Sequence, residues 1–163
     1  MSTADAVARE AAWLASYSAL DGLPALLKAY GGPWDVVQPY VPRTGAQRQT
    51  RLYVTRSNIR VERFGFNRKI NHYMFALRLY WPQSSSTGQA ESVQQDFDSA
   101  VDLVIQRVSG LQGDKTHGAR FLSVAEDPTQ IDVHFADPEA TIQAKAELTA
   151  TITYQADDQD YTS

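Results

Sequence analysis

The stretch from residue 51 to residue 81 reads RLYVTRSNIRVERFGFNRKINHYMFALRLYW, and its pattern predicts a long β-hairpin. In the second limb, every other residue is large and apolar, which is the pattern of a strand with one buried face. The two limbs are joined by GFNRK, whose Gly and Asn are typical of a turn. The apolar row comprises Tyr73, Phe75, Leu77, Leu79 and Trp81.

Helices are expected on both sides of this hairpin. Residues 3–20 carry apolar side chains at spacings of three or four, with Thr3 as the N-cap, which predicts an N-terminal helix. Residues 89–109 show the same periodicity over a longer stretch, which predicts one long amphipathic helix. Pro24 is expected to open a short further turn or helix, because proline suits the first helical position.

Short strands are expected in the remaining segments, at 34–41, 119–126, 130–135 and 145–156. Runs of strands, rather than strict β-α-β alternation, indicate an α+β fold with a mainly antiparallel sheet. The N-terminal helix and the long helix are expected to pack on that sheet. We expect one domain over residues 1–155, followed by an acidic, disordered tail over residues 156–163.

Charge is distributed unevenly along the chain. Residues 43–69 hold seven arginines and one lysine against Glu62, although the whole chain carries a net charge of −4. From Glu126 to Asp160 there are nine acidic residues and one basic residue, Lys145. A contact between the basic segment of one copy and the acidic segment of the next is head-to-tail, and such contacts can close into rings. The candidate interface residues on this basis are Arg56, Arg60, Arg63, Phe64, Phe66, Arg68, Lys69, Asp127, Asp132, Asp137 and Glu139.

No residue pattern indicates catalysis, a metal site or a cofactor. The absence of cysteine excludes disulfides, thiolate metal sites and cysteine catalysis. The histidines His72, His117 and His134 are isolated in the sequence. His72 and His134 are expected to be partly exposed strand residues that could approach each other, and His117 is expected to lie in a loop. Asp98 and Asp102 lie opposite the apolar face of the long helix, where we expect them to be solvated. We therefore expect a protein that is not an enzyme and that binds no cofactor.

Other classes of function remain open at this point. Arginines interleaved with aromatic residues suit a nucleic-acid binder, although the sequence pI of about 5.3 argues against a dedicated one. A small-molecule-binding or enzymatic α+β domain is a second alternative. No apolar run approaches the roughly 18 residues that cross a membrane, so we expect no membrane partner. The aromatic residues that would line a ligand cavity are Tyr73, Phe75, Trp81 and Tyr154.

The series of segments resembles the tail-terminator proteins of long-tailed, non-contractile bacteriophages (siphophages). It comprises the N-terminal helix, the limb NHYMFALRLYW, a Ser-Thr-Gly loop, the helix AESVQQDFDSAVDLVIQRVSG and the closing strands ARFLSVAE, IDVHF and AELTATITY. The resemblance covers residues 3–155 in architecture, and no catalytic or metal motif contributes to it.

The resemblance implies a non-enzymatic virion protein of the tail and neck, present in the host cytoplasm during assembly. Such proteins form a hexameric ring that caps the tail tube, stops its polymerisation and joins it to the head-tail connector, or stopper, protein. The implied partners are copies of the chain itself, the tail tube protein and the connector, with genome DNA passing through the ring without specific binding. The hairpin around residues 64–71 would protrude toward a neighbour or the tube. Another neck or head-completion protein is the alternative within this class.

Overall fold

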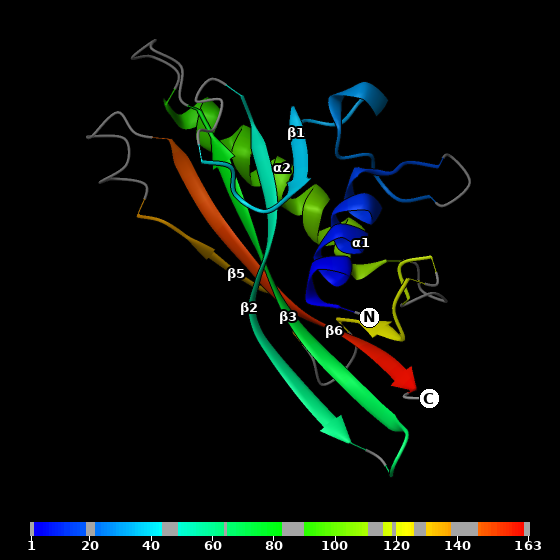
Figure 1. Cartoon of the computed structure of the whole chain (residues 1–163). Helices are drawn as coiled ribbons and strands as arrows, with labels where there is room; N and C mark the ends of the chain where they lie inside the picture. The colour runs from blue at the N-terminus through cyan, green and yellow to red at the C-terminus, as the bar shows by residue number, and fades with distance from the viewer. Residues whose placement is uncertain are drawn as a thin grey trace.

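The structure, a computed structural model, describes most of the chain and confirms the α+β fold (Figure 1). The described residues form two α-helices and a sheet of six strands. Two of these strands are the long hairpin that the sequence predicts. The described residues are 2–18, 22–43, 49–63, 65–82, 90–110, 116–118, 120–125, 130–137 and 147–161.

The sheet is mainly antiparallel, with the strand order β1-β2-β3-β6-β4, and β5 also pairs with β6. The hairpin strands β2 and β3 run side by side through the sheet (Figure 1), and β6 pairs with β3 along its whole length. The first strand is parallel to β2 and lies at the edge of the sheet, where its proline is tolerated. The strands are β1 (Val36–Pro39), β2 (Arg51–Arg63), β3 (Arg68–Trp81), β4 (Ser123–Val124), β5 (Asp132–Phe135) and β6 (Leu148–Tyr161).

The N-terminal helix α1 (Thr3–Ala15) is shorter than the predicted 3–20. Its N-cap is Ser2, not Thr3, because the Ser2 hydroxyl accepts a hydrogen bond from the Asp5 N–H at 3.1 Å. The helix ends where the Ser16 N–H and hydroxyl both turn back to the Trp13 carbonyl. Of the short turn or helix predicted after Pro24, the structure has one 3-10 turn, η1 (Lys28–Tyr30), ended by the left-handed Gly31.

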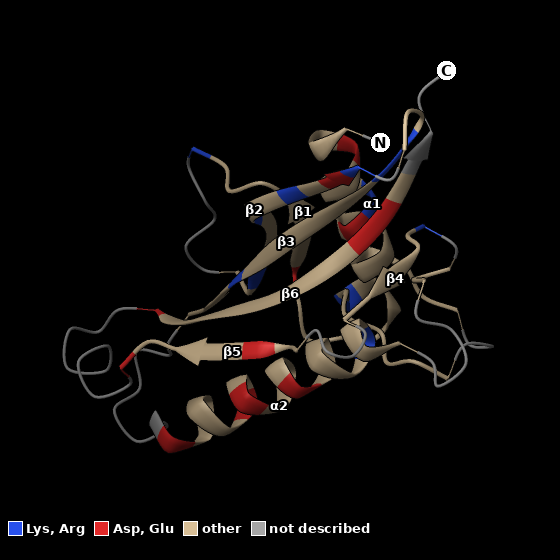
Figure 2. Ribbon diagram, turned by 90° about the horizontal axis from the view of Figure 1, so that it is seen from below, with Lys and Arg blue, Asp and Glu red and all other residues tan. Residues whose placement is uncertain are grey.

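The long helix α2 (Ala90–Ser109) matches its prediction and packs on the same face of the sheet as α1. Its apolar side chains meet the hairpin, where Phe97 stacks on Trp81 with ring centroids 5.8 Å apart. Figure 2 shows α2 running beneath β5 and β6. Burial of this face supplies most of the stability of such a helix. The residues of α2 that join the core are Phe97, Ala100, Val101, Val104 and Val108.

The prediction of a disordered acidic tail is wrong for residues 156–161. These residues continue β6 and pair in register with the start of β3, from Tyr73↔Ala156 to Arg68↔Tyr161. Acidic residues favour disorder when nothing neutralises them. Here the hairpin provides partners, because Asp157 lies opposite His72 and Asp160 opposite Lys69 in the ladder. Residues 162–163 lie outside the described residues.

Candidate interaction surface

The hairpin extends beyond the part of the sheet that the helices cover, and there it forms a projecting arm (Figure 1). We define the arm as residues 56–63, 65–72 and 155–161. In β2, residues 51–54 are buried, whereas nearly all side chains from residue 56 onward are exposed. A β-bulge between Arg56 and Asn58 marks the boundary. Such a bulge bends a strand and increases its twist, which redirects the arm relative to the core.

Two of the predicted interface arginines lie near the base of this arm. Arg56 is exposed, and its guanidinium lies over the Tyr40 ring, 5.6 Å from the centroid. Arg60 points into solvent and forms a partly exposed ion pair with Glu62, with 3.3 Å between Nη2 and Oε1. Neither arginine is buried, so both remain accessible to a partner.

The other predicted basic residues gather near the tip. Arg63 of β2 pairs in register with Lys69 of β3. Arg68 donates a weak hydrogen bond to Gln159 of β6, with 3.4 Å between the two atoms. The structure therefore brings the predicted arginines and lysine together on one element. Phe64 lies outside the described residues.

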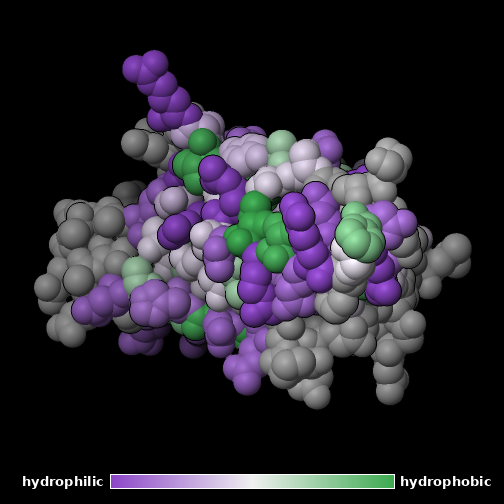
Figure 3. Space-filling view, turned by 60° about the horizontal axis from the view of Figure 1, so that its bottom comes forward, coloured by the Kyte–Doolittle hydropathy of each residue, from purple (hydrophilic) through white to green (hydrophobic). Residues whose placement is uncertain are grey.

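Exposed apolar side chains accompany these charges. Phe66 lies in the turn and is fully exposed, whereas Ile59 and Val61 of β2 are 37% and 51% exposed. In Figure 3, which brings the lower end of the molecule forward, apolar atoms lie among strongly hydrophilic ones. Mixed surfaces of this kind, with aromatic and arginine side chains, are typical of protein–protein contacts.

The arm is held together by polar contacts between its strands. His72 Nδ1 lies 2.6 Å from Asp157 Oδ1, and His72 Nε2 lies 3.4 Å from Glu62 Oε2. Ser123 and Gln155 also donate to the Asp157 carboxylate. These contacts join four strands, β2, β3, β6 and β4, and give His72 a carboxylate on either side. In the part of the chain that the structure describes, no group of three or more His, Asp or Glu side chains is arranged to hold a metal ion.

The histidines do not converge. His134 is exposed on β5 opposite Thr151, whereas His72 lies opposite Asp157, six positions further along β6. His117 lies in the turn before β4, within the segment predicted as a loop, and its side chain is buried.

Besides Glu62 and Asp157 on the arm itself, a second group of acidic side chains lies at the opposite end of the molecule from the tip of the arm. Figure 2 shows Asp and Glu along α2 and β5, and Lys and Arg along β2 and at its turn with β3. Asp132 and Asp137 are exposed at the two ends of β5, whereas Asp127 and Glu139 lie outside the described residues. The one basic residue of α2, Arg107, is buried. The exposed acidic residues of α2 are Glu91, Asp96, Asp98 and Asp102.

A cavity of about 250 Å³ opens beside these acids, between α2, the end of β5 and the start of β6. Its apolar wall includes Phe97 and Phe135, whose rings meet edge to face with centroids 6.0 Å apart. None of the four aromatic residues predicted for a ligand cavity lines it. Three of those residues are buried in the hydrophobic core, and Trp81 packs against that core. The lining residues are Gln94, Phe97, Asp98, Phe135, Ala136, Leu148 and Thr149.

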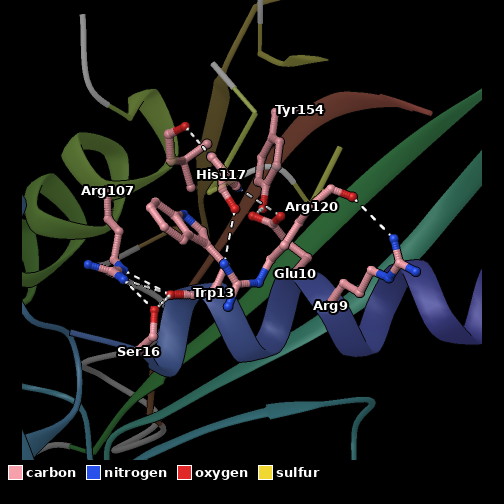
Figure 4. Close-up of polar contacts among 9 residues, drawn as sticks. Arg9, Glu10, Trp13, Ser16, Arg107, His117, Arg120 and Tyr154 are labelled. Carbon is pink, nitrogen blue, oxygen red and sulfur yellow. Dashed lines mark hydrogen bonds and ion pairs between the residues drawn. The ribbon is translucent and has the colours of Figure 1, made fainter. Parts of the chain in front are cut away.

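A buried polar network lies behind the arm and fixes α1 to β6 (Figure 4). The Tyr154 hydroxyl donates to Glu10 Oε1 at 2.5 Å, and His117 Nδ1 lies 2.9 Å from Glu10 Oε2. The Nε2–H of His117 donates to the Val108 carbonyl at 2.8 Å. Burial raises the pKa of Tyr154 well above its usual value, and the Glu10 carboxylate beside it acts in the same direction.

The sequence interpretation missed this network and the cavity, although it predicted that Asp98 and Asp102 are solvated on α2. One signal for the network was present, because Glu10 falls within the apolar stripe of α1, between Val7 and Leu14. A charged residue at such a position is expected to have a buried partner. For the cavity there was no local signal, since its lining comes from three elements far apart in the sequence.

Comparison of the chain with models of protein families found no matching family, and comparison with curated protein sequences found no match. No helix in the described ranges is both long and apolar enough to cross a membrane.

Proposed function

We propose that this protein is a ring-forming structural protein of a phage virion, the tail terminator of a siphophage. The observation that carries the proposal is the separation of two complementary surfaces on one chain. A projecting arm presents arginines with exposed apolar residues, and the far end of the sheet presents acids around an apolar cavity. A copy that offers both surfaces binds its neighbour head to tail, and such contacts close into a ring when the rotation allows.

The chemistry of the two surfaces suits assembly. An exposed ion pair contributes about 0–1 kcal/mol, so the arginines act mainly on orientation and rate of encounter. Apolar anchors such as Phe66 and Val61 supply the larger part of the affinity once they are buried. The arm is rigid enough for this role, because Asp157 and His72 tie its strands together.

The arm is less suited to a nucleic acid than its arginines alone suggest. Binding to phosphates depends on uncompensated positive charge. Here the acids of β6 run alongside the basic strand, with Asp157 opposite His72 and Asp158 opposite Asn71. A partner with patches of both signs and an apolar centre fits the arm better.

The siphophage part of the proposal rests on the resemblance of the segments to those of tail terminators. A closed ring would seat on the last ring of the tail tube, cover the surface where the next tube subunit adds and present its other side to the head-tail connector. Genome DNA would pass through its centre without specific contacts. The protein would act in the tail and neck of the virion after assembling in the host cytoplasm.

A tube-growth assay tests the function. The cognate tail tube protein is polymerised with and without this protein, and tube lengths are measured by negative-stain electron microscopy. We expect shorter tubes with added density at one end, in proportion to the protein added. Unchanged tube lengths with bare ends would contradict the role of tail terminator.

A further inference from the structure

Phe66 occupies an unusual position for a large apolar residue. It lies in the turn of the arm, beside Gly65 in a left-handed conformation, and its side chain is fully exposed. Single exposed apolar residues are common, but an aromatic ring on a projecting turn gains most from burial against a partner. The surrounding charges are positive, since Arg63, Arg68 and Lys69 flank the turn.

The cavity beside α2 has the properties that such a ring requires. Its volume is about 250 Å³. An apolar cavity of about 150 Å³ suffices for benzene, so a phenyl ring fits with room for its neighbouring atoms. Phe97 and Phe135 already meet edge to face at its wall, and aromatic rings favour that geometry.

The charges around the cavity are opposite to those around Phe66. Asp98 forms part of the lining, and Asp102 lies one helical turn further along the exposed face of α2. Asp137 follows Ala136, which also lines the cavity. An arm that places its ring in the cavity therefore brings arginine and lysine side chains to carboxylates.

Phe66 cannot reach the cavity of its own chain. Lys69 lies near the tip, whereas Tyr80 pairs with Thr149 at the cavity. At about 3.3 Å per residue, the strand between them spans roughly 36 Å. We infer that Phe66 of one copy inserts into the cavity of a second copy, against the wall that Phe97 and Phe135 form, with the arginines of the arm on the acids of α2 and β5. This inference rests on the proposed assembly and specifies its contact.

Disulfide trapping tests the contact directly, because the chain contains no cysteine. One variant carries Asn67→Cys, next to an intact Phe66, and a second carries Gln94→Cys at the cavity. The two are mixed under mild oxidation. The matched control replaces Gln94→Cys with Tyr30→Cys, which is 52% exposed on the 3-10 turn. We expect the cavity pair to cross-link at least tenfold faster than the control pair.

A second substitution tests the phenyl ring of Phe66. Adding Phe66→Ser to the Asn67→Cys variant is expected to abolish the faster cross-linking, whereas adding Val41→Ser is expected to leave it intact. Val41 is 50% exposed and lies outside the arm, so the two changes remove similar exposed apolar groups. Because both side chains are exposed, thermal unfolding should be unchanged, which separates loss of contact from loss of fold.

The inference would be overturned by equal cross-linking of the cavity and control pairs, by predominant linking of Asn67→Cys to itself, or by no effect of Phe66→Ser. A small molecule found in the cavity by native mass spectrometry, together with no trapping, would also overturn it. Tube capping distinguishes this failure from failure of the proposed function. If capping persists without trapping, the docking geometry is wrong, whereas trapping without capping leaves the geometry and removes the terminator role.

Discussion

Glu10, His117 and Tyr154 show how single residues set the base of the arm. Val108 offers only a carbonyl acceptor, so His117 carries its proton on Nε2. On the other side of the ring, His117 Nδ1 lies 2.9 Å from Glu10 Oε2. His117 has a positive φ of 51°, a conformation that such contacts hold in place. The network thereby anchors the turn before β4 against α1.

The hydroxyl of Tyr154 gives a prediction that depends on pH. Tyr154→Phe leaves Glu10 Oε1 without this donor, and we expect a loss of about 1–2 kcal/mol in the free energy of unfolding at pH 7. The raised pKa of Tyr154 means that its contribution is complete below about pH 10, where tyrosine in the unfolded chain ionises, and falls as pH rises further. Denaturant unfolding of both proteins from pH 7 to pH 11 measures the difference between their free energies of unfolding. A difference that does not narrow above pH 10 would contradict this prediction.

At the scale of elements, the edge strand β1 is fastened by Asp35. Its carboxylate lies 2.8 Å from the Lys28 ammonium and accepts a hydrogen bond from the Thr50 N–H at 3.0 Å. The Lys28 contact is the main cause that holds the pKa of Asp35 below its usual value, and Thr50 contributes. This stabilisation is therefore present above about pH 4, and it is lost as pH falls through the lowered pKa.

We expect Asp35→Asn to lower the free energy of unfolding by about 1 kcal/mol at pH 7, since a neutral amide replaces the carboxylate that contacts Lys28 and Thr50. The difference between the two proteins should shrink below pH 4. Denaturant unfolding at pH 7, 4 and 2.5 provides the measurement. An equal difference at all three values would show that the charge of Asp35 plays no part.

The two helices are joined by Arg107, whose side chain is buried. Its guanidinium donates to the carbonyls of Trp13 and Pro24 and to the Ser16 hydroxyl. Lysine keeps the charge but has one nitrogen in place of this fork. We expect Arg107→Lys to lower the free energy of unfolding by about 2–3 kcal/mol. A melting temperature equal to that of the parent would show that these contacts contribute nothing.

The sequence predicted those elements whose pattern is local. The alternation from Tyr73 to Trp81 and the apolar face of α2 depend on neighbouring residues, and both elements were confirmed. The last residues of β6 were missed, because an acid such as Asp157 favours disorder until a distant partner such as His72 is placed beside it. After Pro24 only the turn forms, because the chain returns to pair Leu27 with Trp34.

At the scale of the whole molecule, the exposed arginines and the cavity with its acids lie at two different ends. The sequence predicted one basic surface and one acidic surface. In the structure, the candidate residues Asp132 and Asp137 are exposed away from the tip of the arm. The acids of α2 were predicted to be solvated, and they are exposed. Their position beside the cavity depends on the packing of α2 against β5 and β6, which no local pattern specifies.

Reversal of charge on the arm tests its part in assembly. We expect Arg60→Glu together with Arg63→Glu to weaken association by roughly tenfold or more, because each change turns an attraction of about 1 kcal/mol into a repulsion. The matched control reverses the exposed Arg43 and Arg78, which lie outside the arm. Sedimentation velocity over a range of concentrations compares the variants. If the arm variant assembles as well as the control, the arginines are not at the interface.

Native mass spectrometry of the unmodified protein, alone and with the cognate tail tube protein, at low and at high salt, tests head-to-tail closure most directly. The proposed assembly requires one closed species of fixed copy number, six by the resemblance to tail terminators, that dissociates as salt rises. A protein that stays monomeric under every condition, or a dimer that is indifferent to salt, would contradict it.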